Sequence, residues 1–130
     1  MSEASRRIAA PRPDPESAPF WDAARRGALL LKRCRACGNA HYFPRPICPF
    51  CMSAETEWIE ATGAGTIYSF SVMRRAAPSY ALAYVTLDEG VTMMTNLVDC
   101  DFDALKVGMR VKVAFKPSDG GPPVPMFTPL

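Results

Sequence analysis

The sequence predicts a mainly β protein, in which a short N-terminal helix and a small metal-binding module precede a compact β-barrel. Three observations lead to this fold class. Four of the five cysteines form two CxxC pairs, Cys34/Cys37 and Cys48/Cys51. The chain after these pairs falls into short strand-like segments separated by turns. Finally, 130 residues suffice for one ordinary domain, or for a metal-stapled module joined to a small barrel.

The composition is that of a globular protein rather than a disordered tail, with 48% hydrophobic and 22% charged residues. No apolar run approaches the roughly 20 residues that a membrane helix needs. The basic residues that follow Met1 are not succeeded by the apolar stretch of a secretory signal. We therefore expect a cytoplasmic protein that does not enter a membrane.

The N-terminal region predicts an arm followed by a helix. Residues 1–19 contain four prolines and are expected to form a flexible or surface-draped arm. Residues 20–28 suit a helix, and Ser17 or Asp22 is a candidate cap. Trp21 on its apolar face is interpreted as the anchor of this helix on the next module. The alternative is an aromatic anchor for a partner protein.

The two cysteine pairs predict a closed four-sulfur metal site. Each CxxC turn brings two sulfurs to one side of a tight loop, and Gly38 follows the first pair, where a left-handed backbone is often needed. Four protein ligands leave no position for water or substrate, so a zinc ion in this site is structural. Its binding would supply the folding free energy of residues 34–51. The predicted ligands are Cys34, Cys37, Cys48 and Cys51.

The cysteines are open to other interpretations. A thioredoxin-type redox pair opens a helix after a strand, and neither pair is placed so. A disulfide framework is typical of an even cysteine count in a secreted chain, whereas Cys100 stands alone as a fifth cysteine. It is interpreted as a buried or half-buried apolar filler. His41 is interpreted as a surface imidazole or a neighbour of the metal site. Iron in place of zinc stays an open alternative.

The remainder of the chain predicts a β-domain. Four or five short strands with one brief helical turn are typical of a small Greek-key barrel of the OB type. The Gly-rich turn that opens it sets the boundaries of the helix and zinc module at 20–61 and of the barrel domain at 62–130. The expected strands are 66–72, 80–87, 91–98, 110–116 and 126–128, with the helical turn at 102–105.

Two finer expectations concern the first two barrel strands. In the first strand, Tyr68, Phe70 and Val72 alternate with polar residues and should share one face. The second strand, residues 80–87, is a nearly continuous apolar run, which predicts a strand buried on both faces.

No self-sufficient catalytic constellation is found in the sequence. His41 is the single histidine and lies inside the cysteine segment, so a Ser-His-Asp triad would lack its base. Neither a Walker loop nor a GxGxxG motif is present. Four zinc-bound thiolates would bring the formal charge from +2 to zero, which leaves no global field to gather nucleic acid. These features favour a non-catalytic role.

A pair of arginines supplies the candidate ligand contacts. Arg74 and Arg75 end the first predicted barrel strand and precede Tyr80 in the chain. Solvated surface charge is the ordinary explanation of such a pair. Guanidinium groups also fit phosphate oxygens, and a tyrosine ring can stack on an adenine. Arg74, Arg75 and Tyr80 are therefore candidate contacts for a nucleotide-bearing ligand.

The order of these motifs resembles that of a known family. The resemblance is carried by the Phe20-Trp21 helix, the CxxC-x10-CxxC segment with Pro44-Arg45-Pro46, the Gly63-Ala64-Gly65-Thr66 turn and the stretch 105–111. These features resemble small proteins in which a rubredoxin-like zinc ribbon is joined to an acyl-CoA-associated OB-fold. The resemblance covers roughly residues 18–128. It implies that the four cysteines are zinc ligands.

The resemblance also implies a function. Members of this family look like obligate partners of thiolase-fold enzymes, among them lipid-transfer-protein-like thiolases or aldolases, acyl-CoA acetyltransferases and hydroxymethylglutaryl-CoA synthases; others pair with acyl-CoA hydratases. The implied role is a non-catalytic accessory subunit that completes the complex and shapes the acyl-CoA channel, with a CoA thioester as the ligand of the complex. The alternatives are a nucleic-acid-binding zinc ribbon and OB-fold, and a free-standing enzyme.

Overall fold

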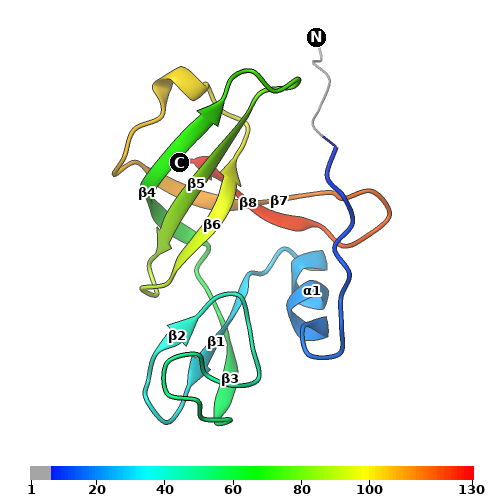
Figure 1. The fold of residues 1–130 in the computed structure, drawn as a ribbon, viewed down its shortest axis with the longest axis vertical. Coiled ribbons are helices and arrows are strands. Elements are labelled where there is room, and N and C mark those ends of the chain that lie inside the picture. The colour runs from blue at the N-terminus through cyan, green and yellow to red at the C-terminus, as the bar shows by residue number, and fades with distance from the viewer. Residues whose placement is uncertain (1–6) are drawn as a thin grey trace.

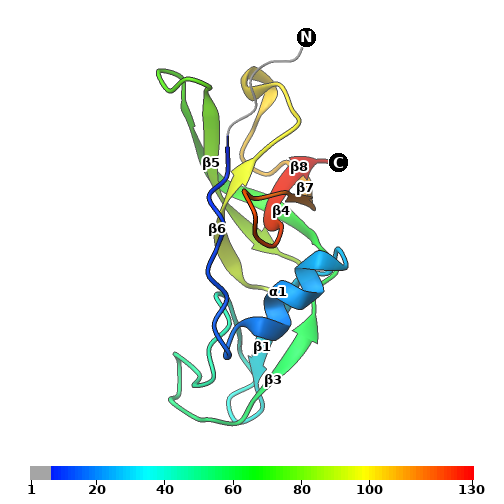
Figure 2. The same cartoon turned by 90° about the vertical axis from the view of Figure 1, so that its right-hand side faces the viewer.

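A three-stranded sheet and a closed five-stranded barrel make up the molecule, as the sequence predicts (Figure 1). The computed structural model describes residues 7–130. The small sheet lies at one end of the molecule and the barrel at the other, and the chain passes from the sheet strand β3 into the barrel strand β4. The one α-helix of the described residues, α1, lies beside the small sheet (Figure 2). The mainly β fold class is confirmed.

Helix α1 (Ala18–Arg25) begins after a turn that is closed by two side chains. The Ser17 backbone N–H donates to Asp14 Oδ1 at 2.8 Å, and the Asp14 N–H donates to Ser17 Oγ at 3.2 Å. Ser17 occupies the N-cap position, as predicted, but its side chain makes no hydrogen bond into the helix. Instead, Asp14 and Ser17 bond each other reciprocally in the turn before the helix, a role of Asp14 that was not predicted from the sequence. The helix ends before Gly27, whose φ of +81° suits glycine.

The small sheet consists of β1 (Leu30–Cys34), β2 (Ala40–His41) and β3 (Thr56–Glu60), in the order β2-β1-β3 with all pairs antiparallel. Leu31 in β1 is fully buried, which explains why this Leu-rich run forms the central strand. The sequence did not predict β2, which is only two residues long.

Aromatic rings hold α1 on this sheet. The buried ring of Phe20 lies 4.8 Å from the ring of Trp21, 5.3 Å from that of Phe43 and 5.9 Å from that of Tyr42, measured between centroids. Phe43 and Tyr42 follow directly after β2, in the loop that leads to the second cysteine pair. Edge-to-face pairs of this kind add to the stabilisation from burial. Trp21 is partly buried against the core, with its ring centroid 6.4 Å from that of Phe43, as the anchor interpretation predicts.

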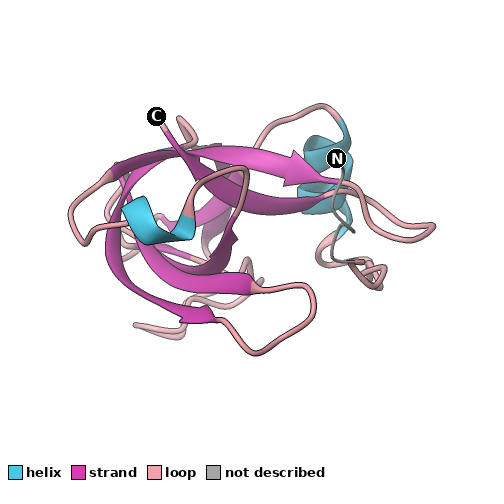
Figure 3. Ribbon diagram, turned by 90° about the horizontal axis from the view of Figure 1, so that it is seen from above, coloured by secondary structure: helices cyan, strands magenta, loops and turns pink. Residues whose placement is uncertain are grey.

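The barrel closes in the order β4-β5-β6-β8-β7, with β7 returning to β4. All neighbours are antiparallel except β6 and β8, and seen from above the strands form a ring (Figure 3). A short 3-10 helix at Phe102–Ala104 interrupts the strands where a helical turn was expected. This is the predicted OB-type connectivity. The strands are β4 (Ala64–Met73), β5 (Tyr80–Leu87), β6 (Thr92–Leu97), β7 (Arg110–Lys116) and β8 (Val124–Pro129).

The expectation that Tyr68 shares a face with Phe70 and Val72 is wrong. The pairing of β4 with β5 shifts between Ile67 and Ser69, which marks a β-bulge at Tyr68. A bulge inserts one extra residue and reverses the alternation beyond it. Phe70 and Val72 therefore pack against the core with Ile67, whereas Tyr68 is 68% exposed.

The expectation that β5 is buried on both faces is also wrong. Ala81, Ala83, Val85 and Leu87 point into the barrel and are buried. Tyr84, between two of them, is 48% exposed. The strand therefore alternates like the wall of a barrel, because only one face of each strand lines the interior.

The described part of the N-terminal arm runs beside the barrel (Figure 2). The Asp119 N–H donates to the carbonyl oxygen of Ile8 at 2.8 Å, and Arg7 Nε donates to Asp119 Oδ2 at 3.0 Å. The arm predicted for residues 1–19 is thus held on the barrel surface at Arg7 and Ile8, while residues 1–6 lie outside the described residues.

Candidate metal centre

The two cysteine pairs sit on two loops with the same backbone hydrogen bonding. In the first loop the Gly38 N–H donates to the Cys34 carbonyl at 2.8 Å, and in the second the Met52 N–H donates to the Cys48 carbonyl at 2.9 Å. Gly38 has a φ of +81°, as predicted, and Met52 has a φ of +68°. The methionine thus takes a left-handed conformation that its residue type does not signal. The matching geometry shows that the loops are equivalent knuckles.

The four sulfurs face one another at distances that suit a metal tetrahedron. The Sγ atoms of Cys34 and Cys51 are 3.5 Å apart, those of Cys37 and Cys48 are 3.7 Å apart, and all four lie within 4.8 Å of one another. A tetrahedral Zn²⁺ with Zn–S bonds of about 2.3 Å separates its sulfurs by about 3.8 Å. A disulfide would need about 2.05 Å. The cluster therefore fits a metal ion and contains no disulfide.

The protonation behaviour of these thiols also points to a cation. The Cys37 backbone N–H, at 3.5 Å from Cys34 Sγ, is the main cause that lowers the pKa of Cys34 to about 7. For Cys51 the Ser53 backbone N–H favours the thiolate, but the neighbouring sulfurs and burial together outweigh it and raise the pKa of Cys51 to about 12. Four adjacent thiolates oppose one another unless a divalent ion lies between them. A bound Zn²⁺ would supply structural cross-linking and keep every ligand deprotonated.

Neither His41 nor Cys100 belongs to the sulfur cluster. His41 is only 4% exposed, so of the two predicted positions the one on the surface is wrong, while a place beside the metal site stays a prediction. Its Nε2 accepts a hydrogen bond from the Arg45 backbone N–H at 3.3 Å. Cys100 is half-buried, as predicted, and burial together with Asp99 and Asp101 raises the pKa of its thiol. Within residues 7–130 the four cysteines are the one group of three or more potential ligand residues found close together.

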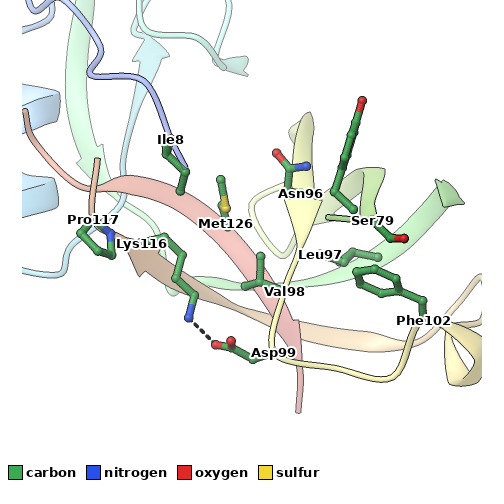
Figure 4. Close-up of a pocket in the computed structure, with 11 residues that line it drawn as sticks. Ile8, Ser79, Asn96, Leu97, Val98, Asp99, Phe102, Lys116, Pro117 and Met126 are labelled. Atoms are coloured by element: carbon green, nitrogen blue, oxygen red, sulfur yellow. Dashed lines mark hydrogen bonds and ion pairs between the residues drawn. The ribbon is translucent and has the colours of Figure 1, made fainter. Parts of the chain in front are cut away.

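The candidate ligand contacts Arg74, Arg75 and Tyr80 are only partly brought together. Tyr80 lines a cavity of about 400 Å³ between the arm, β6 and β8 (Figure 4). Arg74 and Arg75 lie in the turn between β4 and β5 and do not line it. Arg74 is nevertheless near the rim, because the cavity residue Ser79 donates from Oγ to its carbonyl oxygen at 3.2 Å.

Of the residues that line this cavity, only Tyr80 was predicted from the sequence as a ligand contact. Asn96 comes from β6, and Lys116 at the end of β7 pairs with Asp99 at 2.5 Å. These residues are far apart in the chain, and only the closure of the barrel brings them to one place. No spacing in the sequence could have signalled them.

Comparison with known proteins places this architecture in a family. Residues 21–57 match the family described as "ChsH2, rubredoxin-like zinc ribbon domain", and residues 58–116 match "ChsH2, C-terminal OB-fold domain". The chain belongs to the ChsH2 zinc ribbon and OB-fold family. The match to a zinc ribbon, together with the sulfur cluster, supports zinc as the structural metal. The predicted boundaries at 19 and 61 stay predictions.

Several proteins are similar to this member of the ChsH2 family. A "Probable enoyl-CoA hydratase alpha subunit" of Thermomonospora curvata is 33% identical over 92% of this chain, which spans 40% of that protein's length. A "DUF35 domain-containing scaffold protein" of Methanocaldococcus jannaschii is 34% identical over 70% of each chain. Among solved structures, a chain of the "Ltp2-ChsH2(DUF35) aldolase" is 32% identical with a TM-score of 0.78, covering 92% of this chain and 98% of that one.

Over residues 7–130, no helix has the length and apolar character that crossing a bilayer would require.

Proposed function

We propose that this chain is a non-catalytic accessory subunit of a thiolase-type acyl-CoA enzyme, where it completes the complex and shapes the acyl-CoA channel. The observation that carries the proposal is the likeness of this chain to a chain of the solved Ltp2-ChsH2(DUF35) aldolase, which covers 98% of that aldolase chain. Relatives named as a hydratase alpha subunit and as scaffold proteins agree with a role inside an enzyme assembly.

The chemistry of the metal centre supports a structural rather than a catalytic role. With four cysteines as ligands, a tetrahedral zinc has no position left for water or a carbonyl oxygen. The described thiol outside the cluster, Cys100, has a raised pKa and is therefore a poor nucleophile at neutral pH. On this proposal the reacting groups belong to the partner, and this chain contributes shape and binding.

We further propose that Arg74, Arg75 and Tyr80 contact a CoA thioester bound by the complex. Tyr80 lines the cavity beside the arm, and the two arginines lie in the adjoining turn. Arg74 would have to leave Asp103, with which it pairs at 2.8 Å. Both side chains are largely exposed, so breaking this pair costs at most about 1 kcal/mol. Contact with a phosphate group would offset that cost.

Nucleic-acid binding has less physical support. The binding face of an OB-fold lies on its second and third strands, which here are β5 and β6. Their sequences, YALAYVTL and TMMTNL, contain no Lys or Arg to neutralise phosphates.

The test is to co-express this chain with thiolase-type acyl-CoA enzyme subunits encoded in its source genome. We expect a stable complex whose acyl-CoA turnover is lost when this chain is omitted, and no turnover by this chain alone. Arg74→Ala/Arg75→Ala should raise KM for the acyl-CoA, whereas Arg12→Ala, an exposed arginine of the arm, should not. An enzyme subunit that is equally active without this chain would contradict the proposal.

A further inference from the structure

Three barrel strands that follow one another in the chain carry no charged residue; β8 (VPMFTP) is uncharged too, but residues 125–127 of it are buried and it offers little outward surface. The sequences of β4, β5 and β6 are AGTIYSFSVM, YALAYVTL and TMMTNL, without Asp, Glu, Lys, Arg or His. All 15 basic and 13 acidic residues of the chain lie elsewhere. In the same barrel β7 reads RVKVAFK and presents the alternating charges of a solvated wall. The contrast within one barrel needs an explanation, because the outward positions of all its strands would otherwise face water.

The outward side chains of these strands form one continuous patch. The three strands lie side by side (Figure 1), with Tyr84 of β5 directly opposite Met94 of β6. On the other side of β5, Tyr84 pairs with Ser69, next to the bulged Tyr68. Tyr68 is 68% exposed, Tyr84 48% and Met94 59%. We call the surface of Tyr68, Leu82, Tyr84 and Met94 the β4–β5–β6 face.

The bulge in β4 enlarges this face. Without it, the alternation that buries Ile67 would turn Phe70 outward and Ser69 inward. The bulge keeps Ile67 and Phe70 on the core side and leaves two successive residues, Tyr68 and Ser69, outside. An aromatic ring is therefore presented to the exterior without loss of core packing. Bulges often re-aim a side chain at functional positions.

The composition of the β4–β5–β6 face is that of the core of a protein interface. Such cores are depleted in charge and enriched in Tyr and Met relative to the remaining surface. Some polar groups beside the face are already engaged, since Thr86 and Thr92 share a hydrogen bond at 2.9 Å and Asn96 Nδ2 donates to the Ala81 carbonyl at 3.2 Å. A partner that covers the face would have to supply neutral hydrogen-bonding groups for the hydroxyls of Tyr68 and Tyr84.

We propose that the β4–β5–β6 face docks into a concave, uncharged and apolar surface of the partner enzyme subunit. The inference rests on the proposed function and adds the surface through which the partner is bound. A charged partner surface is excluded by the physics of desolvation, because this face offers no counter-charge to a buried ion. The partner must supply apolar and neutral polar groups.

The curvature of the barrel decides between an enzyme subunit and a second copy of this chain. The outer wall of a closed five-stranded barrel is convex. Two convex walls touch over a small area, whereas a stable interface buries about 800 Å² on each partner. A concave partner surface can cover Tyr68, Tyr84 and Met94 together. The face therefore fits a different chain better than itself.

The experiment measures how Tyr84→Lys and Met94→Lys change binding to a thiolase-type acyl-CoA enzyme subunit from the same genome. Each places a charge on the β4–β5–β6 face at an outward position, so the barrel core is untouched. Val107→Lys is the matched control, because Val107 is 66% exposed and lies in the turn before β7, outside the face. Thermal unfolding and zinc content of all variants report whether the fold is kept.

We expect each face variant to weaken binding by at least about 30-fold, the effect of losing an interface hot spot, while Val107→Lys binds like the wild type. If the folded face variants bind the enzyme subunit with unchanged affinity, the assignment of the surface is overturned and the proposed function stands. If the wild-type chain does not bind that subunit, the proposed function fails and this inference fails with it. A wild-type homodimer that Tyr84→Lys dissociates would show that a second copy occupies the face, which also overturns the proposal.

Discussion

Replacing one buried cysteine of the metal centre by serine should unfold the zinc ribbon. Cys48 is fully buried, and its sulfur accepts from the Phe50 backbone N–H at 3.4 Å while facing Cys37 Sγ at 3.7 Å. Zinc contributes about 10–16 kcal/mol to the folding of zinc-finger peptides. If one of four ligands carries a quarter of that, Cys48→Ser costs about 3 kcal/mol or more. That loss is a large share of the stability of a small domain.

The assay is the zinc content per chain by mass spectrometry of protein purified under reducing conditions, together with amide hydrogen exchange. Cys48→Ser should hold far less than one zinc per chain and should lose protection at residues 34–51. Cys100→Ser is the matched control, because this half-buried thiol lies outside the cluster and should keep the metal. A Cys48→Ser protein with full zinc and unchanged exchange would refute the reasoning.

Other substitutions test the packing and the charges. Phe20→Ala should lower the free energy of unfolding by about 3–5 kcal/mol in denaturant titration, because it removes the ring that joins α1 to the sheet. Gly65→Ala should cost about 1–3 kcal/mol, because its Cβ would lie 2.7 Å from Val85 Cγ1. Arg110 lowers the pKa of Asp88 in the fold, so stability should fall as pH drops through that lowered pKa; Asp88→Asn should flatten this dependence in acid titration.

The parts of the fold that were predictable are those fixed by local chemistry. A CxxC turn places two sulfurs by itself, so the convergence of Cys34, Cys37, Cys48 and Cys51 could be anticipated from spacing. The left-handed conformation of Gly38 follows from the same turn. The outward charges of β7 mark the strand directly, since alternation is a property of the strand alone.

The remainder depends on contacts between distant segments. The bulge at Tyr68 exists only in the pairing of β4 with β5, so simple alternation along the strand assigns Tyr68 to the wrong face. His41 is buried because the loop after β2 folds over it, which its polar character did not suggest. Met52 takes a positive φ because it repeats the position of Gly38 in the second knuckle. Each of these features requires the tertiary structure.

The most direct test of an accessory subunit built around a structural metal is native mass spectrometry of the two co-expressed chains. The account predicts a hetero-complex that carries one zinc ion for every copy of this chain. Two chains that migrate as separate species, each at its own mass, would contradict it.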